Sequence, residues 1–96
     1  MDAGTRVYRA NIYDQTAGSF LIDEGRFAGT MPDGIAYVRF ATLLVPMDER
    51  WHTARGEALS EVAIFLVRKI GEFQARLDTL RDEILHAHLT AEEVAQ

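Results

Sequence analysis

Hydrophobic and polar side chains alternate along the first part of the chain, between Arg6 and Tyr13. One face of this segment carries Tyr8, Ala10 and Ile12, and the opposite face is more polar. A period of two residues is typical of a β-strand with one drier face. We therefore expect the first strand of a sheet here.

Further apolar segments and turn signals follow this strand. A polar loop separates it from Ser19–Asp23, which predicts a second strand. Glu24–Gly25 predicts a tight reversal into a short third strand at Arg26–Ala28. Met31–Gly34 has the clearest turn signal, because proline, aspartate and glycine each favour one position of a β-turn.

The longest apolar segment of the N-terminal half runs from Ile35 to Val45 and is hydrophobic on both faces. This pattern predicts a strand that is central in the sheet or buried beneath a helix. Pro46 ends the strand, because proline lacks an amide donor. Arg39 is the one charged residue within the segment. It could anchor an anion or carboxylate in a cleft, but we favour an edge-facing arginine whose aliphatic stem lies over the sheet.

The C-terminal half has the hydrophobic pattern of a helix. From Leu59 to Ala87, apolar residues recur in alternating steps of four and three. This heptad repeat is typical of a coiled-coil seam. The expected interface with a partner consists of Leu59, Leu66, Ile70, Phe73, Leu77, Leu80 and Ile84. The repeat passes through Gly71 without a change of phase, which favours one helix over a helical hairpin.

The ends of this helix are less strongly marked. Asp48 is a suitable N-cap, so we expect the helix in residues 48–89, although Gly56 also permits a separate turn before it. Thr90–Glu93 has the pattern of a capping box, which predicts a short terminal turn or a tail in residues 90–96.

Together these elements predict one α+β domain over residues 1–96. A small antiparallel three- to four-stranded sheet, arranged as a meander, occupies residues 1–47. One long C-terminal amphipathic helix follows it. We place the most regular part of that helix between Glu57 and His88.

The length of the helix implies a partner. The residues from Glu57 to His88 would span roughly 48 Å, whereas a strand is only about 17–20 Å long. We expect the first three turns to be sandwiched between sheet and partner, and the rest to meet only the partner. An uncovered apolar stripe would otherwise form an aggregating patch. The alternative is that the helix curls over a larger sheet.

Charges beside the seam bear on the kind of partner. In a parallel pair of helices, Arg76 would face Arg81 of the second copy. An antiparallel pair or a groove on another protein avoids this clash. We therefore expect a homodimer through residues 59–87, antiparallel in preference.

Composition narrows the classes of function. The chain is 48% hydrophobic with a net charge of −5, which is typical of a globular domain and argues against nucleic-acid binding through a basic face. It has no cysteine, and therefore neither a disulfide framework nor a thiolate site. No apolar stretch approaches the ~20 residues needed to cross a bilayer, and the first residues lack the features of a signal peptide. We expect a cytoplasmic protein without membrane association.

The sequence offers no catalytic motif and predicts no metal or cofactor. His86 and His88 are two residues apart, so a helix places them on different sides, where they cannot chelate one ion. An antiparallel dimer could bring His52 near His88 of the second copy, but we do not favour a zinc site there. The acidic pairs, such as Asp23–Glu24, are sequence neighbours that do not face each other as an acid/base couple.

Two further patterns have a functional and a structural interpretation. Gly25–Gly29 could present backbone amides and Arg26 to an anion, although glycines of a loop explain the segment more simply. The aromatic residues of the N-terminal half could stack nucleic-acid bases, but they alternate between faces, and core packing is the better interpretation.

These observations predict a non-enzymatic protein-interaction module that dimerises through its helix and binds another macromolecule. Small acidic cysteine-free proteins of phages and mobile elements that inhibit host nuclease complexes have this general size and composition. The first alternative is a small-ligand-binding enzyme or sensor with a pocket between sheet and helix, using Arg39 or Tyr37. The second is a structural subunit of a larger assembly.

Overall fold

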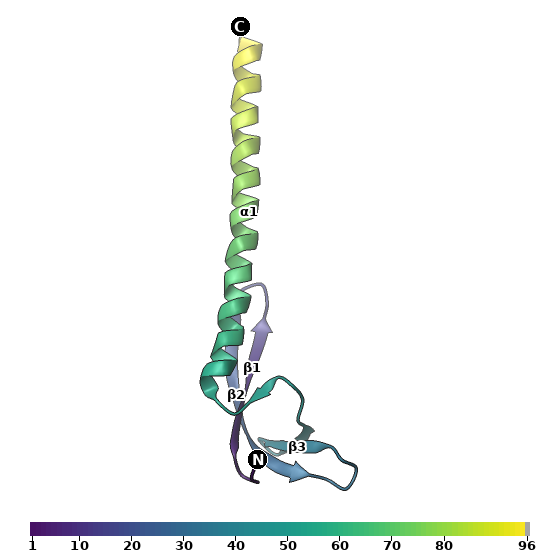
Figure 1. The fold of residues 1–96 in the computed structure, drawn as a ribbon. Coiled ribbons are helices and arrows are strands. Elements are labelled where there is room, and N and C mark those ends of the chain that lie inside the picture. Colours follow the sequence, from purple (N-terminus) through teal and green to yellow (C-terminus); the bar gives the residue numbers. More distant parts are fainter. Residues whose placement is uncertain (96) are drawn as a thin grey trace. The chain divides into compact units, whose positions relative to one another are not determined.

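The computed structural model describes residues 1–95, and the side chains of residues 1–90. The chain divides into two compact units, Met1–Phe65 and the residues from Leu66 onward. The first unit holds a five-stranded antiparallel sheet and the start of helix α1 (Arg55–Ala95), whose remainder forms the second unit (Figure 1). The predicted α+β fold, an antiparallel sheet followed by one long C-terminal helix, is confirmed.

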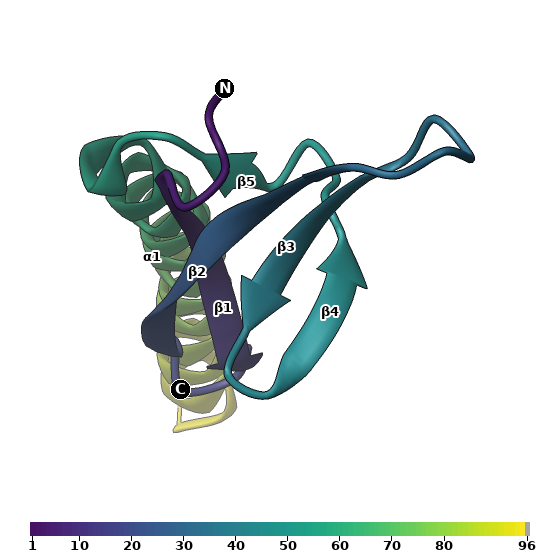
Figure 2. The same cartoon turned by 90° about the horizontal axis from the view of Figure 1, so that it is seen from below.

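The strands are β1 (Arg6–Asp14), β2 (Ser19–Thr30), β3 (Ala36–Phe40), β4 (Leu43–Pro46) and β5 (Trp51–His52). Their order across the sheet is β4-β3-β2-β1-β5, and all neighbouring strands are antiparallel (Figure 2). Strands β1 to β4 follow one another as a meander. The short strand β5 then pairs with the free edge of β1, where Trp51 is the partner of Arg9.

Strand β2 corrects one prediction, because the chain does not reverse at Glu24–Gly25. It continues through Gly25 to Thr30, and the predicted separate strand Arg26–Ala28 is the second half of β2. Gly25 leaves space for a neighbouring side chain and does not form a turn. A Cβ atom on this residue would lie 2.5 Å from Cγ1 of Val38, which is itself fully buried.

The predicted single strand from Ile35 to Val45 is also wrong. The segment forms two strands, β3 and β4, joined by a tight turn in which Ala41 has a φ of 54°. Phe40 pairs with Leu43 directly across this turn. The apolar residues on both faces of the segment therefore belong to two strands, of which β3 is internal and β4 lies at an edge.

A compact core lies on one face of the sheet. Val7, Val38 and Trp51 are buried there, and Phe40, Val45 and Met47 pack against them. The rings of Phe40 and Trp51 meet edge to face, with centroids 5.9 Å apart. Trp51 thus joins β5, at one edge of the sheet, to the core residues of β3 and β4.

Helix α1 begins at Arg55, later than the predicted start near Asp48. Asp48 instead accepts a hydrogen bond from the backbone amide of Arg50, which stabilises a turn before β5. Ala58 and Val62 are buried, and the first turns of α1 lie beside β1 and β2 (Figures 1 and 2). Ile64, in the same turns, is 54% exposed. The first turns of α1 are therefore buried on one face only, and nothing else in the first unit covers their opposite face.

The helix also continues past its predicted end at residue 89. It runs without a break to Ala95, and the Thr90 hydroxyl donates a hydrogen bond to the His86 carbonyl oxygen instead of starting a new turn. A separate terminal turn is therefore not formed in residues 90–95, and Gln96 lies outside the described residues.

Candidate functional site

The residues predicted to form an interface lie on α1 as a heptad stripe. Leu59 and Leu66 are half-buried, whereas the stripe beyond them is exposed. The exposed fractions are 67% for Ile70, 50% for Phe73, 40% for Leu77, 51% for Leu80 and 49% for Ile84. In the described part of the chain, these five side chains form a continuous series of exposed apolar residues at heptad spacing. We call them the helix stripe.

Polar side chains border the helix stripe. The Arg76 guanidinium lies 5.6 Å from the centre of the Phe73 ring, which shields one side of that ring. The half-buried Lys69 forms an ion pair with the exposed Glu72, and Gln74 donates a hydrogen bond to Asp78. These contacts are local to the helix, so they leave the apolar surface available to a partner.

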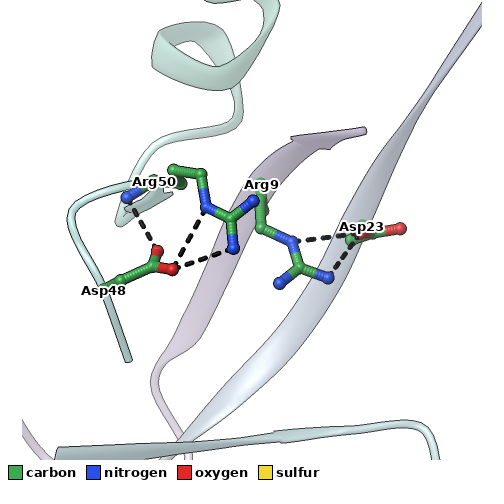
Figure 3. Close-up of polar contacts among 4 residues, drawn as sticks. All are labelled: Arg9, Asp23, Asp48 and Arg50. Atoms are coloured by element: carbon green, nitrogen blue, oxygen red, sulfur yellow. Dashed lines mark hydrogen bonds and ion pairs between the residues drawn. The ribbon is translucent and has the colours of Figure 1, made fainter. Parts of the chain in front are cut away.

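A polar cluster in the sheet was not predicted from the sequence (Figure 3). Arg9 donates two hydrogen bonds to Asp23, and its guanidinium lies 4.4 Å from the centre of the Trp51 ring. The sequence holds a signal for this pair: a hairpin between β1 and β2 with a short loop places residues 9 and 23 opposite each other. Because each charge is neutralised by its partner, the pair serves the fold and offers no free acid or base.

Beside this pair, Asp48 and Arg50 form a second ion pair at 2.9 Å (Figure 3). The hydrogen bonds from the Arg50 side chain hold the pKa of the Asp48 carboxyl below its usual value, and Arg9 acts in the same direction. The same contacts raise the pKa of Arg50. Both residues are exposed, so this pair fixes the turn before β5 and has no catalytic geometry.

His52 connects β5 to the start of α1. Its Nδ1 atom lies 3.1 Å from a Glu57 oxygen, and its Nε2 atom contacts Glu61. The two carboxylates meet different ring nitrogens, so they do not converge on one point. Within the residues that the structure describes, no group of three or more metal-ligating side chains is suitable for an ion. His86 and His88 are exposed on α1.

The structure brings together two residues for which the sequence suggested an anion-binding interpretation. Arg26 of β2 and Arg39 of β3 are direct cross-strand partners, and both are exposed. They line one surface depression, together with Ala3, Gly4, Phe27 and Ala28. Tyr37, the other residue considered for a ligand site, instead donates a hydrogen bond to Asp33. The negative charge of Asp33 raises the pKa of Tyr37.

Comparison with known proteins does not assign a family. No protein-family model, curated protein or solved structure matches the chain. Among residues 1–95, no helix combines the length and the apolar character needed to cross a membrane.

Proposed function

We propose that the chain is a non-enzymatic protein-interaction module that forms a homodimer through α1. The helix stripe carries this proposal, since its five residues are each at least 40% exposed and follow a heptad repeat. An apolar stripe of this length left in water would be an aggregation site. A second helix with the same repeat would cover the helix stripe, because the side chains of each helix would pack into the spaces between the side chains of the other.

The stripe is complementary to itself in an antiparallel arrangement. When two copies align about Ala75, Phe73 faces Leu77 of the second copy and Ile70 faces Leu80. The small residues Ala63 and Ala87 then lie opposite each other toward the ends of the seam. This alignment covers every residue of the helix stripe with an apolar partner, which a homodimer requires of a shared surface.

The flanking charges favour the antiparallel arrangement over the parallel one. In the alignment about Ala75, Lys69 of each copy lies opposite Glu83 of the other, and the like-charge contact between the two Arg76 residues occurs once. A parallel pair would instead place Arg76 against Arg81 twice. The preference rests on exposed charges, so we expect it to decide orientation more than affinity.

Sedimentation equilibrium tests the dimer directly. Wild-type protein should be dimeric at micromolar concentration, and replacing Phe73 and Leu80 by aspartate should convert it to a monomer. The matched control places the same two charges on the polar side of the helix, at Ala75 and Thr79, and should remain dimeric. A wild-type protein that is a stable monomer at this concentration would contradict the proposal.

The folding of the first unit serves as a second control for this experiment. Trp51 is the one tryptophan and is 4% exposed, so its fluorescence reports on the sheet core. The emission spectrum should be the same in the wild type, the Phe73→Asp/Leu80→Asp variant and the control. A shifted spectrum would show that the variant lost its fold and not only its partner.

We propose that the dimer binds a further protein partner, in the cytoplasm. The lack of cysteine fits that compartment, where disulfides are rare. The narrower hypothesis of a phage or mobile-element inhibitor of a host nuclease complex rests on size and composition, and stays a prediction. Copurification of a host complex with the tagged protein, identified by mass spectrometry, tests it.

A further inference from the structure

Three arginines form a row across one face of the sheet. Arg6 of β1 is the direct cross-strand partner of Arg26 of β2, which is in turn the partner of Arg39 of β3. Directly opposite residues of neighbouring strands project from the same face. All three side chains are exposed. We call them the arginine row.

The arginine row is unfavourable for the folded sheet by itself. Like charges directly opposite each other in an antiparallel pair are destabilising, and the row contains two such pairs. Arg6 is partly compensated by Glu24, whose oxygen lies 3.5 Å away, but both side chains are more than half exposed. An exposed pair of this kind contributes little to stability. A chain with a net charge of −5 thus concentrates positive charge at one place on its surface.

The second and third arginines have no acidic partner among the described residues. Arg26 donates a hydrogen bond to the carbonyl oxygen of Gly4, which is a neutral acceptor. The depression that Arg26 and Arg39 line is completed by neutral residues only. Because neighbouring strands are roughly 4.8 Å apart, two adjacent guanidinium groups can converge on a single oxyanion.

We propose that the arginine row binds carboxylates of an acidic segment of a protein partner. The planar guanidinium donates paired hydrogen bonds that match a carboxylate. The row continues into Leu44, the cross-strand partner of Arg39, which is 44% exposed and suits an apolar side chain of the same segment. The proposal builds on the function proposed above, because it names the surface through which the module takes its partner.

A protein segment fits this surface better than a nucleic acid does. The arginine row is only about 10 Å wide at the usual strand spacing, and Glu24 lies beside it. A long polyanion would need a broad basic face to offset repulsion from the remaining negative surface. A few carboxylates on an extended peptide need only the row itself.

Fluorescence anisotropy with a labelled peptide of alternating glutamate and threonine tests the site. We expect the peptide to bind with an affinity that falls as salt increases, and a peptide with glutamine in place of glutamate not to bind. Arg39→Gln should raise Kd by about tenfold, or ~1.4 kcal/mol, since it removes charge-assisted hydrogen bonds to the peptide carboxylate. Arg50→Gln removes the same charge from an exposed arginine outside the row and should leave Kd unchanged.

Four results would overturn the proposal. These are no binding of the glutamate peptide, equal weakening by Arg39→Gln and Arg50→Gln, displacement of the peptide by inorganic phosphate at equal concentration, and tighter binding of single-stranded DNA. The first two remove the site, the third assigns it to free phosphate and the fourth assigns it to nucleic acid.

The same titration separates this proposal from the proposed dimer. The arginine row lies wholly within residues 1–65, whereas the helix stripe lies beyond them. The Phe73→Asp/Leu80→Asp variant should therefore bind the glutamate peptide with unchanged Kd for each chain. A wild-type dimer that fails to bind the peptide overturns the site alone, and a wild-type monomer that binds it overturns the dimer alone.

Discussion

Arg9 and Asp23 form an ion pair inside the sheet, on neighbouring positions of β1 and β2. The Nε and Nη2 atoms of Arg9 donate to the same Asp23 oxygen at 3.2 and 2.9 Å. Asp23 is 8% exposed, so its charge is almost completely removed from water. The guanidinium also lies over the rings of Trp51 and Phe40. Arg9 is therefore both the counter-ion of a buried carboxylate and a cover for the aromatic core.

Replacing Arg9 by glutamine should strongly destabilise the protein. It leaves the Asp23 carboxylate buried without a cation, which typically costs about 3–5 kcal/mol. Urea unfolding at a fixed protein concentration measures the effect, because the stability of a dimer depends on concentration. Arg6→Gln removes the exposed pair with Glu24 and should change the free energy of unfolding by less than about 1 kcal/mol. Equal effects of the two substitutions would contradict the role assigned to Arg9.

The close packing at Gly25 gives a second prediction. A Cβ atom there would lie 2.5 Å from Cγ1 of Val38, 3.2 Å from the carbonyl oxygen of Arg39 and 3.3 Å from the Trp51 ring, and both side chains are buried. We expect Gly25→Ala to lower the free energy of unfolding by about 1–3 kcal/mol. Gly71→Ala is the control, since no atom lies within 4 Å of its added Cβ. That helical substitution should stabilise the protein by roughly 0.5–1 kcal/mol. The two substitutions should therefore change the free energy of unfolding in opposite directions.

Local periodicity was sufficient to predict α1 and the positions of its stripe. Each step of the heptad repeat depends only on residues three or four apart, and the helical geometry then places these residues on one face. The ends were harder, because Asp48 satisfies the cap pattern but is used in a turn with Arg50. A capping residue is favourable in both settings, and only the pairing of Trp51 with Arg9 decides between them.

The sheet shows where the sequence alone is insufficient. Gly25 looks like a turn residue, yet it is present because Val38 and Trp51 approach the backbone from other strands. The arginine row has the same origin, since Arg6, Arg26 and Arg39 meet only through strand register. Register depends on loop lengths and on bulges such as the one between Phe27 and Gly29. Neither is visible in the spacing of charged residues.

The turn before β5 should respond to acid. Hydrogen bonding by Arg50 holds the pKa of Asp48 below its ordinary value of 3.8, so the contact stabilises the folded protein above that value. The stabilisation is lost as the pH falls through the lowered pKa. An NMR titration of the Asp48 carboxyl carbon should show this pKa, and Arg50→Gln should return it toward 3.8. Arg39→Gln, the control, should leave it unchanged, and an ordinary pKa in the wild type would contradict the contact.

The flanking charges of α1 can identify the alignment of the proposed dimer. In the alignment about Ala75, Lys69→Glu places like charges opposite each other at two sites and should raise the dimer Kd by about two- to fivefold, or 0.5–1 kcal/mol. Adding Glu83→Lys restores opposite charges and should restore the Kd. Because Lys69 also pairs with Glu72 within its own helix, the restoration and not the initial loss is the informative result.

Reversing the charge of Arg76 distinguishes the remaining arrangements. In the alignment about Ala75, Arg76 meets its own copy, so Arg76→Glu exchanges one like-charge contact for another and should leave the dimer Kd unchanged. In a parallel dimer the same substitution would face Arg81 with a carboxylate and tighten the dimer. In an antiparallel dimer shifted by one heptad toward the C-terminus, Arg76 faces Glu83, and Arg76→Glu would weaken it. Sedimentation equilibrium of this variant at low salt, where exposed charges are least screened, therefore separates the three arrangements by the sign of the change in Kd.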